Sequence, residues 1–190
     1  MDREAESRAR ETYKRMCEDA RKVDYQLKVM IEYESRLPGI TPHMAFWWWD
    51  HMGPIERYRL WSPDHLAFDW EIEPAVNGRI GAIHSVTEHV GDFTVYLRLR
   101  YEDPKSYPGS RQYKHAIVES SLTDDDHIMG WILHEFDQVE DGIVMRNVFQ
   151  LPLGTPQQIV KGIIEHSNKE MERLPEFLPN LYTEAVKKQG

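Results

Sequence analysis

His166 and Glu170 stand four positions apart in a segment whose apolar spacing predicts a helix, so their side chains should lie one above the other. An imidazole nitrogen and a carboxylate oxygen arranged in this way can bind one metal ion. The pair continues the apolar stripe of Ile159 and Ile163, which we expect to face the interior. A buried His and Glu need a polar partner, and a divalent cation would serve. By its spacing alone the pair also fits an ordinary surface contact.

Further ligands must come from other parts of the chain, which contains nine histidines, about twice the number usual for its length. His65 follows a Pro-containing turn and enters an apolar segment. Glu88 lies in a strand-like segment whose two faces do not separate by polarity, and this local pattern favours an exposed carboxylate. His134 lies in the middle of another strand-like segment, where a hydrogen-bonded core histidine and a catalytic histidine fit equally well.

The elements that must position these residues are predicted from hydrophobic spacing. Residues 2–34 are predicted to form one amphipathic helix, because apolar residues recur mostly at steps of three and four. Residues 43–49, which include three consecutive tryptophans, are interpreted as a buried helical turn. Strands are predicted over residues 80–90, 93–101, 115–121, 128–139 and 143–151. A second helix is predicted to start with Thr155 as its cap and Pro156 at its first position, and to end or kink near Leu174 and Pro175 with a short helical tail to Lys188.

Short turns between the predicted strands imply an antiparallel meander. A sheet of this kind, curved around the C-terminal helix, gives an α+β fold. We expect an N-terminal helix over residues 1–34 and a single domain over residues 35–190. The N-terminal helix is expected to pack on its own domain, and a dimerisation arm that forms a homodimer is the alternative.

The composition excludes several classes of protein. With 41% hydrophobic residues, six Trp, nine Tyr and six Phe, the chain can build a core and is not a disordered chain. A net charge of −9 argues against nucleic-acid binding, and the single cysteine, Cys17, excludes a disulfide framework. The sequence carries no long apolar segment, so we expect a cytoplasmic protein without a membrane partner. It also lacks the motifs of a phosphate-binding loop, a serine-hydrolase elbow or a dinucleotide site.

A series of motifs between residues 39 and 174 resembles one enzyme family. The segments Gly39-Ile40-Thr41-Pro42-His43-Met44, Trp47-Trp48-Trp49 and Tyr58-Arg59-Leu60-Trp61-Ser62-Pro63-Asp64-His65 resemble those of the 2,4-diacetylphloroglucinol hydrolase family, which includes phloretin hydrolase. Later motifs pair Glu88 with Gly91, Gly130 with His134, Gly142 with Arg146 and Phe149, and His166 with Glu170. Each motif alone is weak, whereas their common order is fairly specific.

The resemblance implies a helix-grip fold of the Bet v 1 type, with a zinc ion in the cavity between sheet and helix. Carried over by position, the ligands would be His65, Glu88, His166 and Glu170. Two imidazoles and two carboxylates suit zinc, and iron or manganese would also fit this ligand set. The reaction implied is hydrolysis of a C–C bond between an acyl group and a phenolic ring, in which the metal polarises the ketone and activates a water molecule.

The resemblance also suggests roles for residues around the metal. His134 is the candidate proton shuttle that protonates the ring carbon, and Tyr58 would hydrogen-bond an oxygen of the substrate. Trp47, Trp48 and Trp61 would supply apolar walls for a small phenolic or polyketide substrate.

Two alternatives stay open at this point. One is a non-catalytic helix-grip module that binds an aromatic ligand. The other is a metal-dependent enzyme of the same scaffold that carries out ring opening, cyclisation or lactone hydrolysis on a polyketide. The chain departs from the family pattern in two places: the step from His65 to Glu88 is shorter than in the family's bacterial members, and Ser62 stands where members often carry His.

Overall fold

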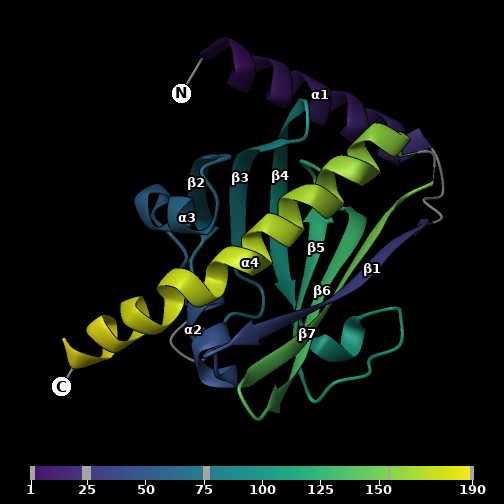
Figure 1. Cartoon of the computed structure of the whole chain (residues 1–190). Coiled ribbons are helices and arrows are strands. Elements are labelled where there is room, and N and C mark those ends of the chain that lie inside the picture. Colours follow the sequence, from purple (N-terminus) through teal and green to yellow (C-terminus); the bar gives the residue numbers. More distant parts are fainter. Residues whose placement is uncertain (1–2, 23–26, 75–77, 154, 189–190) are drawn as a thin grey trace.

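The computed structural model describes residues 3–22, 27–74, 78–153 and 155–188, which form one antiparallel sheet with helices on both faces (Figure 1). The helices are α1 (Arg3–Lys22), α2 (Pro42–His51), α3 (Ile55–Trp61) and α4 (Gln157–Lys187), with a short 3-10 helix at Pro104–Ser106. The strands are β1 (Leu27–Pro38), β2 (His65–Ile72), β3 (Ile83–Val90), β4 (Phe93–Glu102), β5 (His115–Leu122), β6 (Ile128–Val139) and β7 (Gly142–Pro152). Within the described residues the sheet order is β1-β7-β6-β5-β4-β3-β2, which confirms the predicted meander and the α+β class.

The two faces of the sheet are covered by different helices. Figure 1 shows α4 crossing one face diagonally, with α2 and α3 beside it; the main core between these elements includes Phe136 and Leu174. On the opposite face α1 packs through Tyr13, whose hydroxyl donates a hydrogen bond of 3.0 Å to the Leu122 carbonyl. The apolar face of α1 therefore packs against the sheet of the same chain.

The prediction of one helix over residues 2–34 was wrong beyond α1. Residues 23–26 lie outside the described residues, and from Leu27 the chain forms β1, which pairs with β7. Ile31, Tyr33, Ser35 and Leu37 are buried or half-buried, while the charged residues between them are exposed, and this period of two is the pattern of a strand that buries one face. Met30, which fitted the helical spacing, has an exposed fraction of 56% on the outer face of the strand.

The start of α4 differs by one residue from the prediction. Pro156 stands at the N-cap, and its carbonyl accepts the first hydrogen bonds of the helix. Thr155 is therefore not the cap; its hydroxyl donates a hydrogen bond of 2.7 Å to the carbonyl of Pro152. The interpretation of residues 43–49 as a helical turn is confirmed, since they lie within α2.

The α4 helix continues through Pro175 and Pro179 to Lys187, so it does not end near Pro175, and the helical tail predicted to Lys188 is part of the same helix. A proline inside a helix removes one backbone hydrogen bond, but here Leu174 and Leu178 are both buried and hold the helix to the core on either side of Pro175. Packing therefore outweighs the local effect of the proline. Among the described residues, neither α4 nor another helix is long and apolar enough to cross a membrane.

Candidate metal centre

Two strands and the long helix bring the candidate ligands together. His65 is the first residue of β2 and pairs with Glu88 of β3. Close packing of Gly91 against Gly162 brings α4 near this end of the sheet, since a Cβ on Gly162 would lie only 3.1 Å from the nitrogen of Gly91. His166 follows Gly162 by about one helical turn, which places it next to Glu88 and His65.

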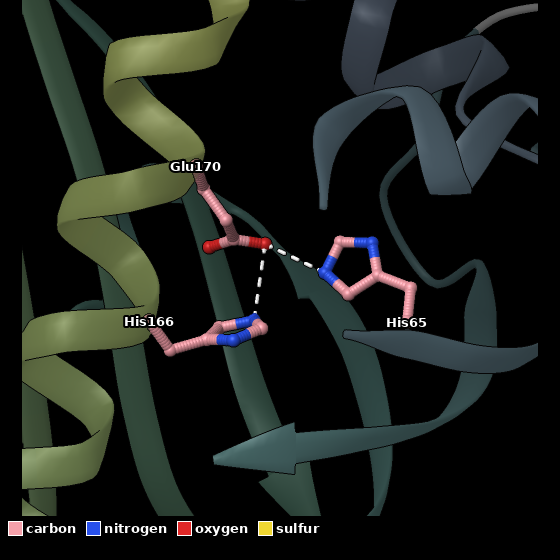
Figure 2. Close-up of side chains that lie close together, drawn as sticks. All are labelled: His65, His166 and Glu170. Atoms are coloured by element: carbon pink, nitrogen blue, oxygen red, sulfur yellow. Dashed lines mark hydrogen bonds and ion pairs between the residues drawn. The ribbon is translucent and has the colours of Figure 1, made fainter. Parts of the chain in front are cut away.

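His65, His166 and Glu170 form a buried cluster at this position (Figure 2). Glu170 Oε1 lies 2.9 Å from His65 Nε2 and 3.5 Å from His166 Nε2. One ligand atom from each residue lies within 4.8 Å of the others, and Figure 2 shows both imidazole rings beside the same carboxylate. The spacing of His166 and Glu170 also fitted a contact on the protein surface. That interpretation is wrong, because both side chains are buried.

Glu88 adds a second carboxylate to this cluster. Its Oε2 lies 3.6 Å from His65 Nε2 and 3.8 Å from His166 Nε2, and it accepts a hydrogen bond of 3.2 Å from the hydroxyl of Tyr58. The local strand pattern favoured an exposed carboxylate, and this was wrong, because Glu88 is buried. The end of β3 is covered by α4, a contact between distant segments that local alternation does not register.

The hydrogen bonds of His65 leave one ring nitrogen directed at negative charge. Its Nδ1 lies 2.9 Å from the backbone carbonyl of Tyr58, and a carbonyl can only accept, so Nδ1 carries the proton. The opposite nitrogen, Nε2, faces oxygens of both Glu88 and Glu170. A metal ion that binds Nε2 and both carboxylates would satisfy all three groups at once.

The environment of His166 also favours a positive charge at this site. It is buried, and neither of its ring nitrogens has a hydrogen-bond partner. Burial lowers the pKa of His166, but the charges of Glu170, Glu88 and Asp64 outweigh this effect and raise the pKa to about 9. Burial raises the pKa of Glu170, whereas His166 and His65 hold it well below its usual value. The site thus favours ionised carboxylates around a centre of positive charge.

These observations fit a transition metal ion. Two imidazole nitrogens and two carboxylate oxygens converge in a buried space, and the backbone hydrogen bond of His65 fixes its ring as metal-binding histidines are commonly fixed. Asp64 Oδ2 lies 4.0 Å from His166 Nδ1, so a carboxylate also stands behind the second imidazole. Asp64 belongs to the Tyr58–His65 motif, but its position behind His166 was not predicted from the sequence.

Tyr58 supports the site from α3. Its ring stacks on the His65 ring, with centroids 3.7 Å apart and planes at 11°, while its hydroxyl reaches Glu88. Burial, with the charges of Glu88 and Glu170, raises the pKa of Tyr58 well above its usual value. The phenol therefore stays protonated and acts as a hydrogen-bond donor to Glu88.

The tryptophans chosen as cavity walls occupy three different environments. Trp61 donates a hydrogen bond of 2.9 Å from its indole nitrogen to the backbone carbonyl of Glu170, and its ring lies beside His65. Trp48 is fully buried and packs edge-on against Trp61. Trp47 packs instead against His51 and against Tyr182 of α4. The structure thus brings Trp61 to the metal cluster and places Trp47 on another face of α2.

His134 lies deep in the sheet, on β6. Its Nδ1 lies 2.7 Å from Oδ1 of Asn147, its neighbour on β7, and the ring of Trp49 packs at 5.0 Å. Burial lowers the pKa of His134, while Asn147 and the charge of Glu170 act in the opposite direction. The imidazole is therefore neutral near pH 7, within the electrostatic reach of the metal cluster.

Trp49 was not among the tryptophans predicted to line the substrate site, yet it lies beside two of the candidate residues. Its ring contacts both His134 and Trp61, at centroid distances of 5.0 Å and 5.4 Å. The available signal was helical spacing: Ala45, Trp48, Trp49 and Met52 form one buried stripe at steps of three, one and three, and Trp47 lies outside it.

A sheet that holds one long C-terminal helix across its face defines the helix-grip class, and solved structures of that class resemble this one. Ara h 8.0201 superposes with a TM-score of 0.53 at 15% identity, covering 79% of this chain and 97% of that protein. The KanY protein (ms6282) gives a TM-score of 0.57 at 8% identity with the same coverages. Protein Ms6760 from Mycobacterium smegmatis gives 0.52 at 12% identity, covering 84% and 97%. At these identities the likeness shows a Bet v 1-like fold.

The family follows from the sequence itself. Residues 27–183 match the family model described as the DAPG hydrolase PhiG domain, and the chain belongs to this family. The match spans β1 to most of α4, including all four candidate ligands. A comparison with curated proteins gives no match.

Proposed function

We propose that this protein is a zinc-dependent hydrolase that cleaves the C–C bond between an acyl group and a phenolic ring. The family supports hydrolysis of such a bond, and the ligand set proposed for zinc is His65, Glu88, His166 and Glu170. The observation that carries the proposal is the convergence of two buried imidazoles on two carboxylates, with His65 Nε2 facing both acidic groups. Iron or manganese would fit the same donors, and the test below distinguishes the three metals.

The chemistry divides between the metal and the chain. A zinc ion bound at this site supplies Lewis acidity, which polarises the acyl carbonyl and lowers the pKa of the attacking water. In the overall reaction the water oxygen bonds to the acyl carbon, the bond from that carbon to the ring breaks, and the ring carbon takes a proton. The products are a carboxylic acid and the deacylated phenol.

His134 is the proposed carrier of the proton. Its neutral imidazole can take the proton that the water loses and then deliver it to the ring carbon. Its hydrogen bond to Asn147 places the proton on Nδ1 and leaves Nε2 as the base. Tyr58 has a different task, because its protonated hydroxyl can donate a hydrogen bond to a phenolic or carbonyl oxygen and orient the ring. Trp61 and Trp48 supply apolar walls.

The proposal is tested first by metal content. We expect about one zinc per chain by elemental mass spectrometry, and a sharp loss in the His166→Ala and Glu88→Ala variants. His89→Ala is the matched control, since this exposed residue follows Glu88 directly and contacts Thr94 instead. Full metal occupancy in the His166→Ala variant would contradict the ligand assignment.

The reaction is tested next on acylphloroglucinols. We expect the wild-type protein to release a carboxylic acid and a deacylated ring, detected by mass spectrometry, and a chelator to abolish turnover. A non-catalytic ligand-binding protein would keep its affinity for the aromatic compound after metal removal and form no product. Ring opening, cyclisation or lactone hydrolysis would give products of different mass or retention.

A further inference from the structure

A second buried polar pair lies on the same sheet, apart from the metal ligands. His84 of β3 and Glu119 of β5 are exposed by only 1% and 3%, and His84 Nε2 lies 3.6 Å from Glu119 Oε1. Strand pairing explains their proximity: Tyr101 of β4 stands opposite Glu119, and His84 stands opposite the residue two positions before Tyr101. The pair thus bridges three adjacent strands.

The pair is not satisfied by the protein. Neither Nδ1 of His84 nor Oε1 of Glu119 has a hydrogen-bond partner, although both atoms are buried. Tyr101, whose ring lies 5.5 Å from that of His84, donates its hydroxyl proton to the carbonyl of Trp49 at 2.8 Å and so has no proton left to donate to Glu119. Buried polar atoms without partners are destabilising and uncommon, so this pair calls for a ligand group that supplies the missing hydrogen bonds.

The pair faces the same interior as the metal cluster. Alternate residues of a strand point to one face, and His84 and Glu88 are separated by four positions of β3, roughly 13 Å along the strand. The charges of Glu170 and Glu88 act on Glu119, and the charge of Glu119 in turn acts on Tyr58. Glu119 therefore lies within electrostatic reach of the candidate metal centre.

Aromatic rings pack around His84 in this part of the interior. Phe68 stacks on the imidazole with centroids 5.4 Å apart, Trp70 meets it nearly edge-on at the same distance, and Tyr101 lies at 5.5 Å. Faces and edges of aromatic rings favour a flat unsaturated ligand. A polar group at the end of such a ligand would meet His84 and Glu119.

The protonation states define the kind of polar group that fits. Burial raises the pKa of Glu119 to about 8, where Arg79 acts against it and Glu170 and Glu88 act with it. Burial also lowers the pKa of His84 to about 3. Both side chains are therefore neutral near pH 7, and each offers a hydrogen-bond donor and an acceptor. A hydroxyl group, which both donates and accepts, matches this pair, whereas a ligand carboxylate would be repelled by the charges of Glu170 and Glu88.

We propose that His84 and Glu119 form a second polar subsite on the same face of the sheet as the metal cluster, which binds a phenolic hydroxyl of the substrate remote from its acyl group. The orientation of the ring, with its acyl end at the metal cluster, rests on the proposed function. The subsite itself rests on the two unpartnered atoms and their aromatic surroundings. It would select rings that carry a hydroxyl on the side opposite the acyl group.

Binding of two ligands that differ by one hydroxyl tests the subsite. The probes are 2,4,6-trihydroxyacetophenone and 2,6-dihydroxyacetophenone, which lacks the hydroxyl opposite the acyl group, and the readout is the dissociation constant from titration calorimetry. We expect the wild-type protein to bind the trihydroxy compound about 10-fold more tightly. In Glu119→Leu this preference should fall to about 1-fold, with the affinity for the dihydroxy compound changed by less than about threefold.

Two further variants control for structural damage. Glu119→Gln keeps a neutral hydrogen-bonding group and should retain part of the preference. Ser120→Ala removes the next residue of β5, a buried serine that points to the other face and hydrogen-bonds Glu102, and should retain all of it. Thermal melting of each variant shows whether the fold is intact.

The outcomes separate the subsite from the proposed function. An undiminished preference in folded Glu119→Leu would overturn the subsite, as would a wild-type protein that binds both probes equally or binds neither. A preference that disappears in Glu119→Leu, in a protein that contains no metal and cleaves no C–C bond, would support the subsite and reject the hydrolase. Metal-dependent cleavage without any hydroxyl preference would do the reverse.

Discussion

The indole nitrogen of Trp61 donates a hydrogen bond of 2.9 Å to the backbone carbonyl of Glu170. This bond joins the last residue of α3 to the middle of α4, at the residue whose carboxylate lies between His65 and His166. The α3 helix also carries Tyr58, whose carbonyl orients His65. A short helix thus positions one candidate ligand through its backbone and another through an indole.

Removal of the Trp61–Glu170 hydrogen bond should weaken metal binding without abolishing it. In Trp61→Phe we expect the affinity for zinc to fall by about 10-fold, because groups that orient metal ligands commonly contribute 10–100-fold. Competition with a chromophoric chelator measures the dissociation constant. Trp47→Phe is the control, since Trp47 packs against His51 and Tyr182, and equal losses of affinity in both variants would contradict the role of the hydrogen bond.

Replacement of His134 should separate turnover from metal binding. We expect His134→Ala to keep its zinc while kcat falls by about 10²–10⁴-fold, the usual contribution of a positioned acid–base group. Steady-state kinetics on an acylphloroglucinol, with metal content measured on the same sample, provides the check. The exposed His127 offers a matched control in His127→Ala, which should keep full activity. An unchanged kcat in His134→Ala would remove this residue from the mechanism.

Local pattern predicted much of the fold because most strands are joined by short turns. The segments predicted for β3 to β7 match the observed strands closely, since alternation and turn residues act over a few positions. β1 was missed for the opposite reason: its partner, β7, lies more than a hundred residues away, and the spacing of residues 27–30 also fits a helix. Pairing with β7 therefore determines that these residues form a strand and not a helix.

The candidate site shows the same limit. The His166–Glu170 pair was visible from helical spacing alone, whereas the burial of Glu88 depends on how closely α4 approaches β3. His84 and Glu119 gave no signal, because they are thirty-five residues apart and meet only through the strand order β3-β4-β5. Only the ordered family motifs had indicated Glu88 as a ligand.

Arg146 is predicted to be essential for stability. It forms ion pairs with Glu135 at 2.5 Å and Glu32 at 2.6 Å, and Glu135 is fully buried. Arg146→Met would leave the carboxylate of Glu135 buried without its charge partner, a change that destabilises proteins by about 3–5 kcal/mol. Urea unfolding measures the free energy of unfolding. The double variant Arg146→Met/Glu135→Gln should recover part of the loss, and a loss no smaller than in the single variant would contradict the ion-pair explanation.

Glu119 should make the folded protein less stable as pH rises. Its pKa is about 4.5 when exposed and about 8 in the folded state, where burial raises it and Glu170 and Glu88 add to the effect against Arg79. Between these values the folded state binds one more proton than the unfolded state, so the stabilisation is complete below about pH 4.5 and is lost as pH rises through about 8.

The Glu119→Gln variant has no carboxyl group at this position, so this pH dependence should be absent from it. The difference in unfolding free energy between Glu119→Gln and wild type should grow by about 3–5 kcal/mol from pH 5 to pH 8.5. Urea unfolding at each pH, with both proteins at equal metal saturation, measures it; Ser120→Ala should run parallel to wild type, and a difference for Glu119→Gln that stays constant with pH would show that the carboxyl does not change its ionisation on folding.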